Sequence, residues 1–479
     1  MDWKPSDTRD KPLYKQIAEY IERRITYGEF PPGSLLPSER TLAKELQVNR
    51  STIVAAYDLL RASGVIETRH GSGTRVSTDI WGISRTRVPN WRQIVETGSF
   101  LPNLPLIRQI RKETMEGDLI DLASGELSAD LFPNRALRSI LSSEEFDGHL
   151  GYEHPQGNVP LRETLSAHVK TWRDIDSTPS SILITSGAQQ ALHLIVQCLL
   201  KPGDAVAIED PSYCYSLPLF QSAGLRTFLL PVDKYGANPD DLAALHRKHR
   251  IKMAFLNPNF QNPTGTLLDL SRRKRFLELS AEFGIPLVED DPYSVTSFHG
   301  EKIPTLKSLD RNGTVLYISS LTKIVASGLR IGWIIGPQTV IERLADAKQQ
   351  VDFGHSIFPQ WIANRFLSSA DFPEHIAMLR EELRKKRDLL VSALHQCLPT
   401  EVEFTVPEGG IHLWCSVKQT DNESRLLKAA IKRGVVFVPG SVMGSKKGYA
   451  RFTFGRAEKD SITDAIQRFS EALRDVIPS

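Results

Sequence analysis

The stretch Ser319–Trp333, SSLTKIVASGLRIGW, places Lys323 among small, hydroxylated and apolar residues and follows it seven positions later with Arg330. The lysine comes just after the apolar run VLYIS, which is typical of a buried strand. In α/β folds, strand ends border the crevices in which ligands bind. A lysine there is a candidate for covalent chemistry through its amine. The alternative at this point is a surface lysine in a loop.

Apolar runs of the same kind recur along the chain and are separated by segments with helical spacing. They are SILIT, AVAIED, MAFLN, PLVEDD, VLYIS and RIGWIIG, all between residues 181 and 336. Strands that alternate with helices predict an α/β domain with a mostly parallel sheet. From about Phe372 a long charged helix precedes mixed strand and helix patterns, which predicts a smaller α+β lobe.

The residues around Lys323 match the needs of an aldehyde that carries a phosphate. The lysine amine can form a Schiff base, and the hydroxyls of Ser320 and Thr322 and the guanidinium of Arg330 can bind a phosphate. The segment SGAQQAL follows SILIT and opens a helix, so its backbone amides would point at an anion. These amides belong to Gly187, Ala188 and Gln189. Pyridoxal 5'-phosphate is the cofactor that fits this combination.

Four more side chains suit the cofactor's pyridine ring. Asp290 and Tyr293, in EDDPYS, would hold the ring nitrogen protonated and bond the ring oxygen, respectively. Asn262, in NPNFQNPTG, would be a second partner of that oxygen, and Tyr213, in EDPSYCY, would stack on the ring. Each one alone also fits a turn residue, a satisfied polar group or a core aromatic. Their joint order along the chain favours the cofactor site.

From about residue 120 to the end, the chain resembles the fold type I aminotransferases, whose cofactor is pyridoxal phosphate. The motifs that carry the resemblance are GYEHPQG, TSGAQQ, EDPSY, NPNFQNPTG, EDDPYS, SSLTK with GLR, and ARFTFG. The resemblance implies that Lys323 is the Schiff-base lysine and that the ring and phosphate contacts are those given above. It also implies that Arg451, together with Gly125, binds an α-carboxylate. Tyr152 would reach the phosphate of a neighbouring subunit, which implies a homodimer.

The first residues have a different pattern. Apolar positions at steps of three and four predict helices over about Leu13–Tyr27 and Arg50–Ala62, and Ser38 would cap another helix between them. The runs VIETR and TRVS flank HGSG and predict a hairpin. Three helices and a wing form a winged helix-turn-helix, with an ordinary helical hairpin as the alternative. Residues 1–77 contain 12 lysines and arginines against 10 aspartates and glutamates, so DNA contacts must come from individually placed residues.

This segment resembles the GntR family of bacterial regulators through PLYKQI, PPGSLLPSERTLAKELQVNRSTI and RHGSGT. The resemblance implies DNA contacts from the start of the third helix, from the residue after SE and from the wing. These residues are Arg40, Arg50, Ser51, Thr52 and His70. A GntR head on an aminotransferase-like body is the architecture of the MocR subfamily, which the whole chain resembles.

The MocR resemblance implies a regulator that binds a double-stranded DNA operator and whose body senses an amino acid or related amino compound. The alternative is a catalytically active aminotransferase with an autoregulatory DNA-binding head. A body that has lost its cofactor is disfavoured, because Lys323, Asp290 and Arg330 are intact. Ser327 stands where the subfamily usually has proline, and Thr322 where serine is commoner. Tyr215 stands where some relatives carry an arginine, so dicarboxylic or γ-amino acid effectors are less supported.

These patterns predict a DNA-binding domain over 1–77, a linker over 78–118 and a body over 119–479 with its small lobe from about 372. The linker carries Trp81 and Trp91 but little periodicity, and part of it is expected to pack on something. The polar first residues and the lack of any run of about 18 apolar residues predict a cytoplasmic protein without membrane contact. The four cysteines have no metal-ligand spacing, which predicts core packing and no metal site.

Overall fold

The computed structural model divides the chain into two compact units, residues 1–99 and 100–479. The residues that it describes are 3–5, 11–69, 73–78, 94–95, 97–143, 145–146, 150–418 and 422–476. His70, Trp81 and Trp91 therefore lie outside the described residues. Within these ranges, no helix has both the length and the apolar character needed to cross a membrane.

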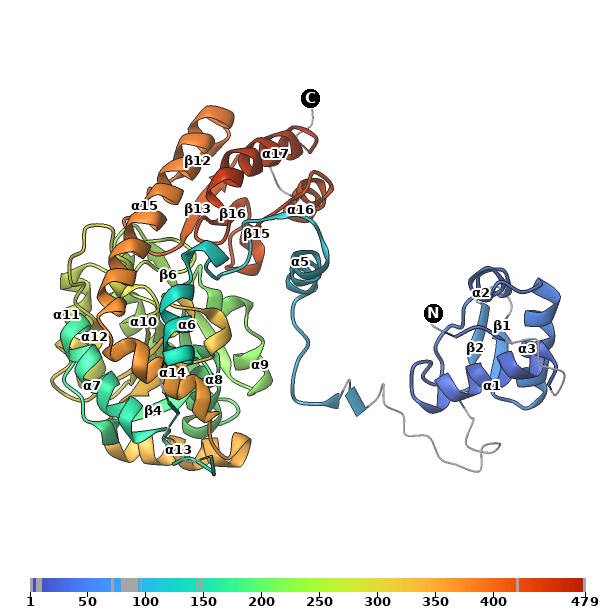
Figure 1. Ribbon diagram of the computed structural model, residues 1–479, viewed down its shortest axis with the longest axis horizontal. Coiled ribbons are helices and arrows are strands. Elements are labelled where there is room, and N and C mark those ends of the chain that lie inside the picture. The colour runs from blue at the N-terminus through green and yellow to red at the C-terminus, as the bar shows by residue number, and fades with distance from the viewer. Residues whose placement is uncertain are drawn as a thin grey trace. The chain divides into compact units, whose positions relative to one another are not determined.

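The first unit contains the three helices and the hairpin that the sequence predicts (Figure 1). They are α1 (Leu13–Thr26), α2 (Glu39–Leu46), α3 (Arg50–Ala62), β1 (Ile66–Arg69) and β2 (Gly73–Val76). The Ser38 hydroxyl caps α2 by accepting a hydrogen bond from the Thr41 amide at 3.1 Å. One apolar side of α3, which includes Ile53 and Tyr57, is fully buried against α1 and α2. The predicted winged helix-turn-helix is confirmed.

An eight-stranded sheet forms the centre of the second unit, and its strand order is β4-β11-β10-β9-β8-β5-β6-β7. In that order the strands are Ile182–Thr185, Gly332–Ile335, Val315–Ser320, Leu287–Asp290, Ile251–Leu256, Ala205–Asp210, Arg226–Asp233 and Gly236–Ala237. The five strands from β10 to β6 pair in parallel, whereas β11 and β7 run antiparallel to their neighbours. The predicted mostly parallel sheet is confirmed.

Helices cover both faces of this sheet, which explains why its strands are continuous apolar runs. On β5, Val206 and Ile208 pack with residues of one face, while Ala205 and Ala207 pack with those of the other. The first face carries α8 (Ala188–Leu199), α9 (Leu219–Ser222) and α13 (Gln338–Asp352). The second carries α7 (Val159–Arg173), α10 (Pro239–His249), α11 (Leu270–Phe283), α12 (Leu306–Leu309) and α14 (Ile357–Ser368), and α6 (Asn134–Ser143) packs on α14.

A smaller lobe follows, built on an antiparallel sheet of order β12-β13-β16-β15. Its strands are Val402–Phe404, His412–Val417, Tyr449–Thr453 and Val438–Pro439, and its helices are α15 (Asp371–Cys397), α16 (Glu423–Lys432) and α17 (Ile462–Arg474). Figure 1 shows α15 and α17 beside these strands. An earlier segment also joins this lobe, because β3 (Ile120–Asp121) pairs in parallel with β14 (Val435–Val436).

Helix α5 and the burial of two cysteines differ from the expectations. The stretch without expected periodicity contains helix α5 (Pro105–Glu116), which begins at a proline and buries Ile110. Proline is favourable there because the first helical residue has no intrahelical acceptor for its amide. Cys214 and Cys415 are buried as expected, whereas Cys198 and Cys397 are only half-buried.

Candidate functional site

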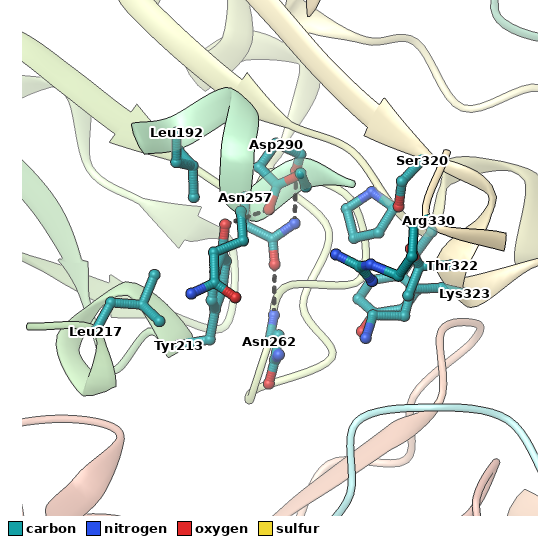
Figure 2. Close-up of a pocket in the computed structure, with 14 residues that line it drawn as sticks. Leu192, Tyr213, Leu217, Asn257, Asn262, Asp290, Ser320, Thr322, Lys323 and Arg330 are labelled. Carbon is teal, nitrogen blue, oxygen red and sulfur yellow. Dashed lines mark hydrogen bonds between the residues drawn. The ribbon is translucent and has the colours of Figure 1, made fainter. Parts of the chain in front are cut away.

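A cavity of about 210 Å³ lies where β5, β8, β9 and β10 end and α8 begins (Figure 2). It brings together ten of the twelve predicted cofactor residues, all but Gly187 and Tyr152. The lining residues are Ala188, Gln189, Leu192, Tyr213, Leu217, Asn257, Asn262, Asp290, Pro292, Tyr293, Ser320, Thr322, Lys323 and Arg330. Sequence reasoning missed Asn257, although it belongs to the quoted motif NPNFQNPTG. It also missed Leu192 and Pro292, which belong to the quoted motifs SGAQQAL and EDDPYS, and it gave no signal for Leu217.

Lys323 lies on a short 3₁₀ turn that directly follows β10. Its Nζ donates a hydrogen bond to the carbonyl oxygen of Gly125. Burial, and after it the guanidinium of Arg451, lowers the pKa of Lys323 to about 8. A larger fraction of the amine is then neutral near pH 7, and only the neutral amine is a nucleophile.

Asp290, the last residue of β9, forms the floor of the cavity with Tyr213 and Asn257. The Tyr213 hydroxyl donates to Asp290 Oδ2, and Asn257 Nδ2 donates to the Asp290 carbonyl oxygen at 2.7 Å (Figure 2). Burial raises the pKa of Asp290 to about 6. Its Oδ1 is buried and has no partner among the described residues. One acceptor of this carboxylate is therefore left for a donor that enters the cavity.

The start of α8 and Arg330 form an anion cradle on the other side. Gly187 precedes α8 with φ of +79°, and a Cβ placed on it would lie 2.7 Å from Arg330 Nη2. Only glycine therefore lets the guanidinium approach so closely. Arg330 Nη2 donates to the Ser186 carbonyl oxygen at 2.8 Å. Helix amides, a guanidinium and the hydroxyls of Ser320 and Thr322 suit a phosphate.

Arg451, on β16, reaches the cavity through Asn262. Its Nη1 donates to Asn262 Oδ1 at 3.1 Å, and its Nη2 donates to the Ala123 carbonyl oxygen. The Arg451 Nε is buried without a partner among the described residues, and burial lowers the pKa of the guanidinium to about 10. A buried cation with an unused donor is suited to a carboxylate.

Tyr152 does not reach this cavity within one chain. Its side chain is 86% exposed, and its ring lies 5.4 Å from that of Phe353. Gly125 does lie at the site, since a Cβ placed on it would be 3.8 Å from Lys323 Nζ.

Of the predicted DNA contacts that the structure describes, Arg50, Ser51 and Thr52 begin α3, whereas Arg40 lies in the first turn of α2. Arg40, Arg50 and Ser51 are exposed and Thr52 is half-buried. Arg50 Nη2 pairs with Glu39 Oε2 at 2.9 Å, although the arginine side chain remains 70% exposed. Such a pair holds the guanidinium at the helix start, where a recognition helix contacts bases.

Two segments of the chain match family models. Residues 13–76 match bacterial regulatory proteins of the gntR family, and residues 117–469 match aminotransferases of class I and II. The chain is 38% identical to the uncharacterised HTH-type transcriptional regulator YdfD of Bacillus subtilis (strain 168), over 97% of each chain. YisV of the same strain, another uncharacterised HTH-type transcriptional regulator, is 37% identical over 100% of this chain and 99% of its own length. The chain belongs to the MocR subfamily of GntR transcriptional regulators.

The body of this MocR regulator is also similar to solved aminotransferases. A kynurenine aminotransferase of Pyrococcus horikoshii, solved in complex with PMP, matches with a TM-score of 0.74 and 32% identity. The match covers 79% of this chain and 96% of that one. The expected fold type I body is confirmed, and pyridoxal phosphate is the cofactor of this family.

The cavity of this MocR chain fits that cofactor in three independent places. The buried Asp290 Oδ1 has no partner and suits a protonated ring nitrogen. Gly187 leaves the anion cradle open for a phosphate. Lys323 carries an amine with a lowered pKa.

Proposed function

We propose that this regulator binds an operator with its first unit and detects an amino compound in the cavity of its second. The observation that carries the proposal is the gathering of Lys323, Asp290 and Arg330 around one cavity that Arg451 reaches through Asn262. The separate helix-turn-helix unit favours a regulatory role for this cavity over metabolic turnover.

Each residue of the cavity would have a definite task. When bound, pyridoxal phosphate supplies an aldehyde carbon that exchanges one amine for another. Lys323 would hold that carbon in the resting state, and Arg330 with the start of α8 would bind the phosphate. Asp290 would keep the ring nitrogen protonated, while Tyr293 and Asn262 would bond the ring oxygen.

The chemistry around Arg451 favours an effector with an amine and a single carboxylate. Arg451 has a buried Nε without a partner among the residues that the structure describes, which suits the carboxylate. Tyr215 lies in the 3₁₀ turn that follows β5, where some relatives carry an arginine. A second carboxylate would therefore find no guanidinium at this position, and its burial without a partner would cost free energy.

A homodimer is supported by exposed large apolar side chains. Leu150, Tyr152, Val351, Phe353 and Phe358 are each at least half exposed, and the rings of Tyr152 and Phe353 lie 5.4 Å apart. Exposed apolar side chains that contact one another favour an interaction site. A second copy seated there would bring its own Tyr152 towards the first copy, in keeping with the expected role of this residue at the neighbouring phosphate.

The segment at the start of the second unit touches α8, which lines the cavity, and the nearby α9. The Phe100 ring lies 5.6 Å from that of His193 on α8, and the Leu101 amide donates to Ser222 Oγ on α9 at 3.0 Å. Leu192, the neighbour of His193, lines the cavity. A change in the cavity would therefore reach the segment that connects it to the DNA-binding unit.

The second candidate function is transamination, which the lowered pKa of Lys323 favours. An enzyme needs this neutral amine as a general base. If transamination were the main function, amino acids that change the absorbance of the bound cofactor would be converted to 2-oxo acids with steady turnover once a second 2-oxo acid is supplied to accept the amino group, and DNA binding would not respond.

One screen tests the proposal. Amino acids, amines and small peptides are added to the cofactor-loaded protein, and absorbance is recorded. Each hit is then tested for its effect on binding to genomic DNA fragments that the protein itself has selected. We expect at least one monocarboxylic amino compound to change both signals. Hits that change absorbance alone would contradict a sensing role.

A further inference from the structure

His412, the first residue of β13, lies behind the cavity wall against Tyr293, which lines the cavity, and has no role in the function described so far. Its side chain is 2% exposed. A Cβ placed on Gly125 would lie 3.7 Å from His412 Cε1 and 3.8 Å from Lys323 Nζ. The imidazole therefore borders the same small space as the lysine amine.

Hydrogen bonds connect both ring nitrogens of His412 to buried hydroxyls. Nε2 lies 3.0 Å from the phenol oxygen of Tyr293, which lines the cavity, and Nδ1 lies 3.0 Å from Thr453 Oγ1. The pairing of β13 with β16 places His412 directly opposite Thr453. Tyr293 is 1% exposed and Thr453 is fully buried, so the three side chains form one enclosed chain.

The charges that face His412 keep its ring neutral. Burial, then the guanidinium of Arg451 and the amine of Lys323, lower the pKa of His412 well below its usual value. Burial also raises the pKa of Tyr293, so its phenol stays protonated. A neutral imidazole has one N–H and a phenol has one O–H, which limits how this chain can be arranged.

Two arrangements satisfy the two hydrogen bonds. In the first, Tyr293 donates to Nε2, and the phenol then has no proton for any group in the cavity. In the second, Thr453 donates to Nδ1 and His412 donates from Nε2 to the phenol oxygen. Only the second leaves the Tyr293 proton free to point into the cavity.

We propose that His412 is a positioning residue that, held in one tautomer by Thr453, fixes the Tyr293 phenol and directs its proton to an oxygen in the cavity. The inference rests on the proposed cofactor site, in which that oxygen belongs to the pyridine ring. Because a donor to the phenol oxygen makes the phenol a stronger donor itself, His412 strengthens the bond to the ring oxygen.

The test is a pH titration of the visible absorbance of the bound cofactor. Hydrogen bonds to the ring oxygen stabilise its negative charge and favour the deprotonated form, so a weaker bond raises the midpoint of the titration. We expect His412→Phe to raise the midpoint by about 0.4–1 pH unit, the size of one ordinary hydrogen bond. His412→Gln, which keeps an N–H near the position of Nε2, should restore most of the wild-type midpoint.

Two further variants make the test specific. Thr453→Val preserves shape but removes the hydroxyl that would hold the His412 tautomer, and it should also raise the titration midpoint. This variant keeps the test available if His412→Phe fails to fold. In Tyr293→Phe, which loses the phenol, adding His412→Phe should give little further shift, because the two residues act through one bond. A protein that binds no cofactor would refute the cofactor site itself. Bound cofactor with unchanged midpoints in the His412 and Thr453 variants, or additive shifts in the double variant, would overturn only the role of His412.

Discussion

Arg451 of the small lobe donates a hydrogen bond to Asn262 of the large lobe, with 3.1 Å between Nη1 and Oδ1. The bond joins the proposed receptor of the effector's carboxylate to a residue that lines the cofactor cavity. A carboxylate that engages Arg451 would therefore act on the cavity and on the contact between the lobes at once. Closure of lobes around a ligand is a common way to transmit binding.

Arg451→Ala should shift the response to higher effector concentrations while leaving cofactor and DNA bound. A charge-assisted pair between guanidinium and carboxylate is worth about 1.5–3 kcal/mol, so effector affinity should fall about tenfold or more. Operator binding is measured against effector concentration, with Arg384→Ala, an exposed arginine on α15, as the control. A wild-type response in Arg451→Ala would mean that the effector enters elsewhere.

Lys323→Ala should lack the visible absorbance of cofactor attached through a lysine, even with excess pyridoxal phosphate, because no other described lysine lines the cavity. Far-ultraviolet circular dichroism should remain unchanged. The matched control is Lys201→Ala, at an exposed lysine beyond the end of α8. An unchanged absorbance spectrum in Lys323→Ala would remove the basis of the cofactor assignment.

Arg50→Ala should weaken binding to selected DNA by about 1–3 kcal/mol if the guanidinium contacts a base edge, and the loss should differ between sequences. Arg23→Ala, at an exposed arginine on α1, serves as the control. Binding is measured by fluorescence anisotropy at two salt concentrations. A uniform loss across sequences would indicate a phosphate contact instead.

Asp290→Asn should stabilise the protein without cofactor at neutral pH. The pKa of Asp290 is raised to about 6 in the folded chain, so its contribution to stability is present below about pH 4 and is lost as pH rises through about 6. The asparagine variant lacks this loss, so its free energy of unfolding should exceed that of the wild type by on the order of 2 kcal/mol at pH 7.5. Urea unfolding measures the free energy of unfolding of both proteins, and the difference in this free energy between variant and wild type should shrink at pH 4.5. Equal differences at both pH values would mean that Asp290 titrates normally.

The sequence predicted the parts of the fold that depend on local pattern. Ser38 and the apolar side of α3 defined the helices of the first unit, and apolar runs such as VLYIS identified strands buried on both faces. Helix α5 was missed because Leu106, Ile107 and Ile110 form an apolar stripe of little more than one turn, of which only Ile110 is buried. The pairing of β3 with β14 joins segments more than 300 residues apart, which no local pattern encodes.

The residues of the candidate site also fall into those that local motifs predict and those that only the fold brings together. Asp290 ends β9, Lys323 follows β10 and Arg330 precedes β11, and short motifs reveal all three. His412 gave no signal, because its partners Tyr293 and Thr453 lie on other segments and meet it only through the fold. The Arg50–Glu39 pair was also unforeseen, since it joins the starts of two helices.

The coupling of cavity to DNA is tested most directly by one titration that records two signals. Cofactor-loaded protein bound to fluorescent operator DNA is titrated with the effector while cofactor absorbance and DNA anisotropy are followed together. If the two sites are coupled, both signals change over the same range of effector concentration, and DNA reciprocally alters effector affinity by the same factor. Absorbance that saturates with no change in anisotropy, and effector affinity that is equal with and without DNA, would contradict the proposal that this cavity senses for the DNA-binding unit.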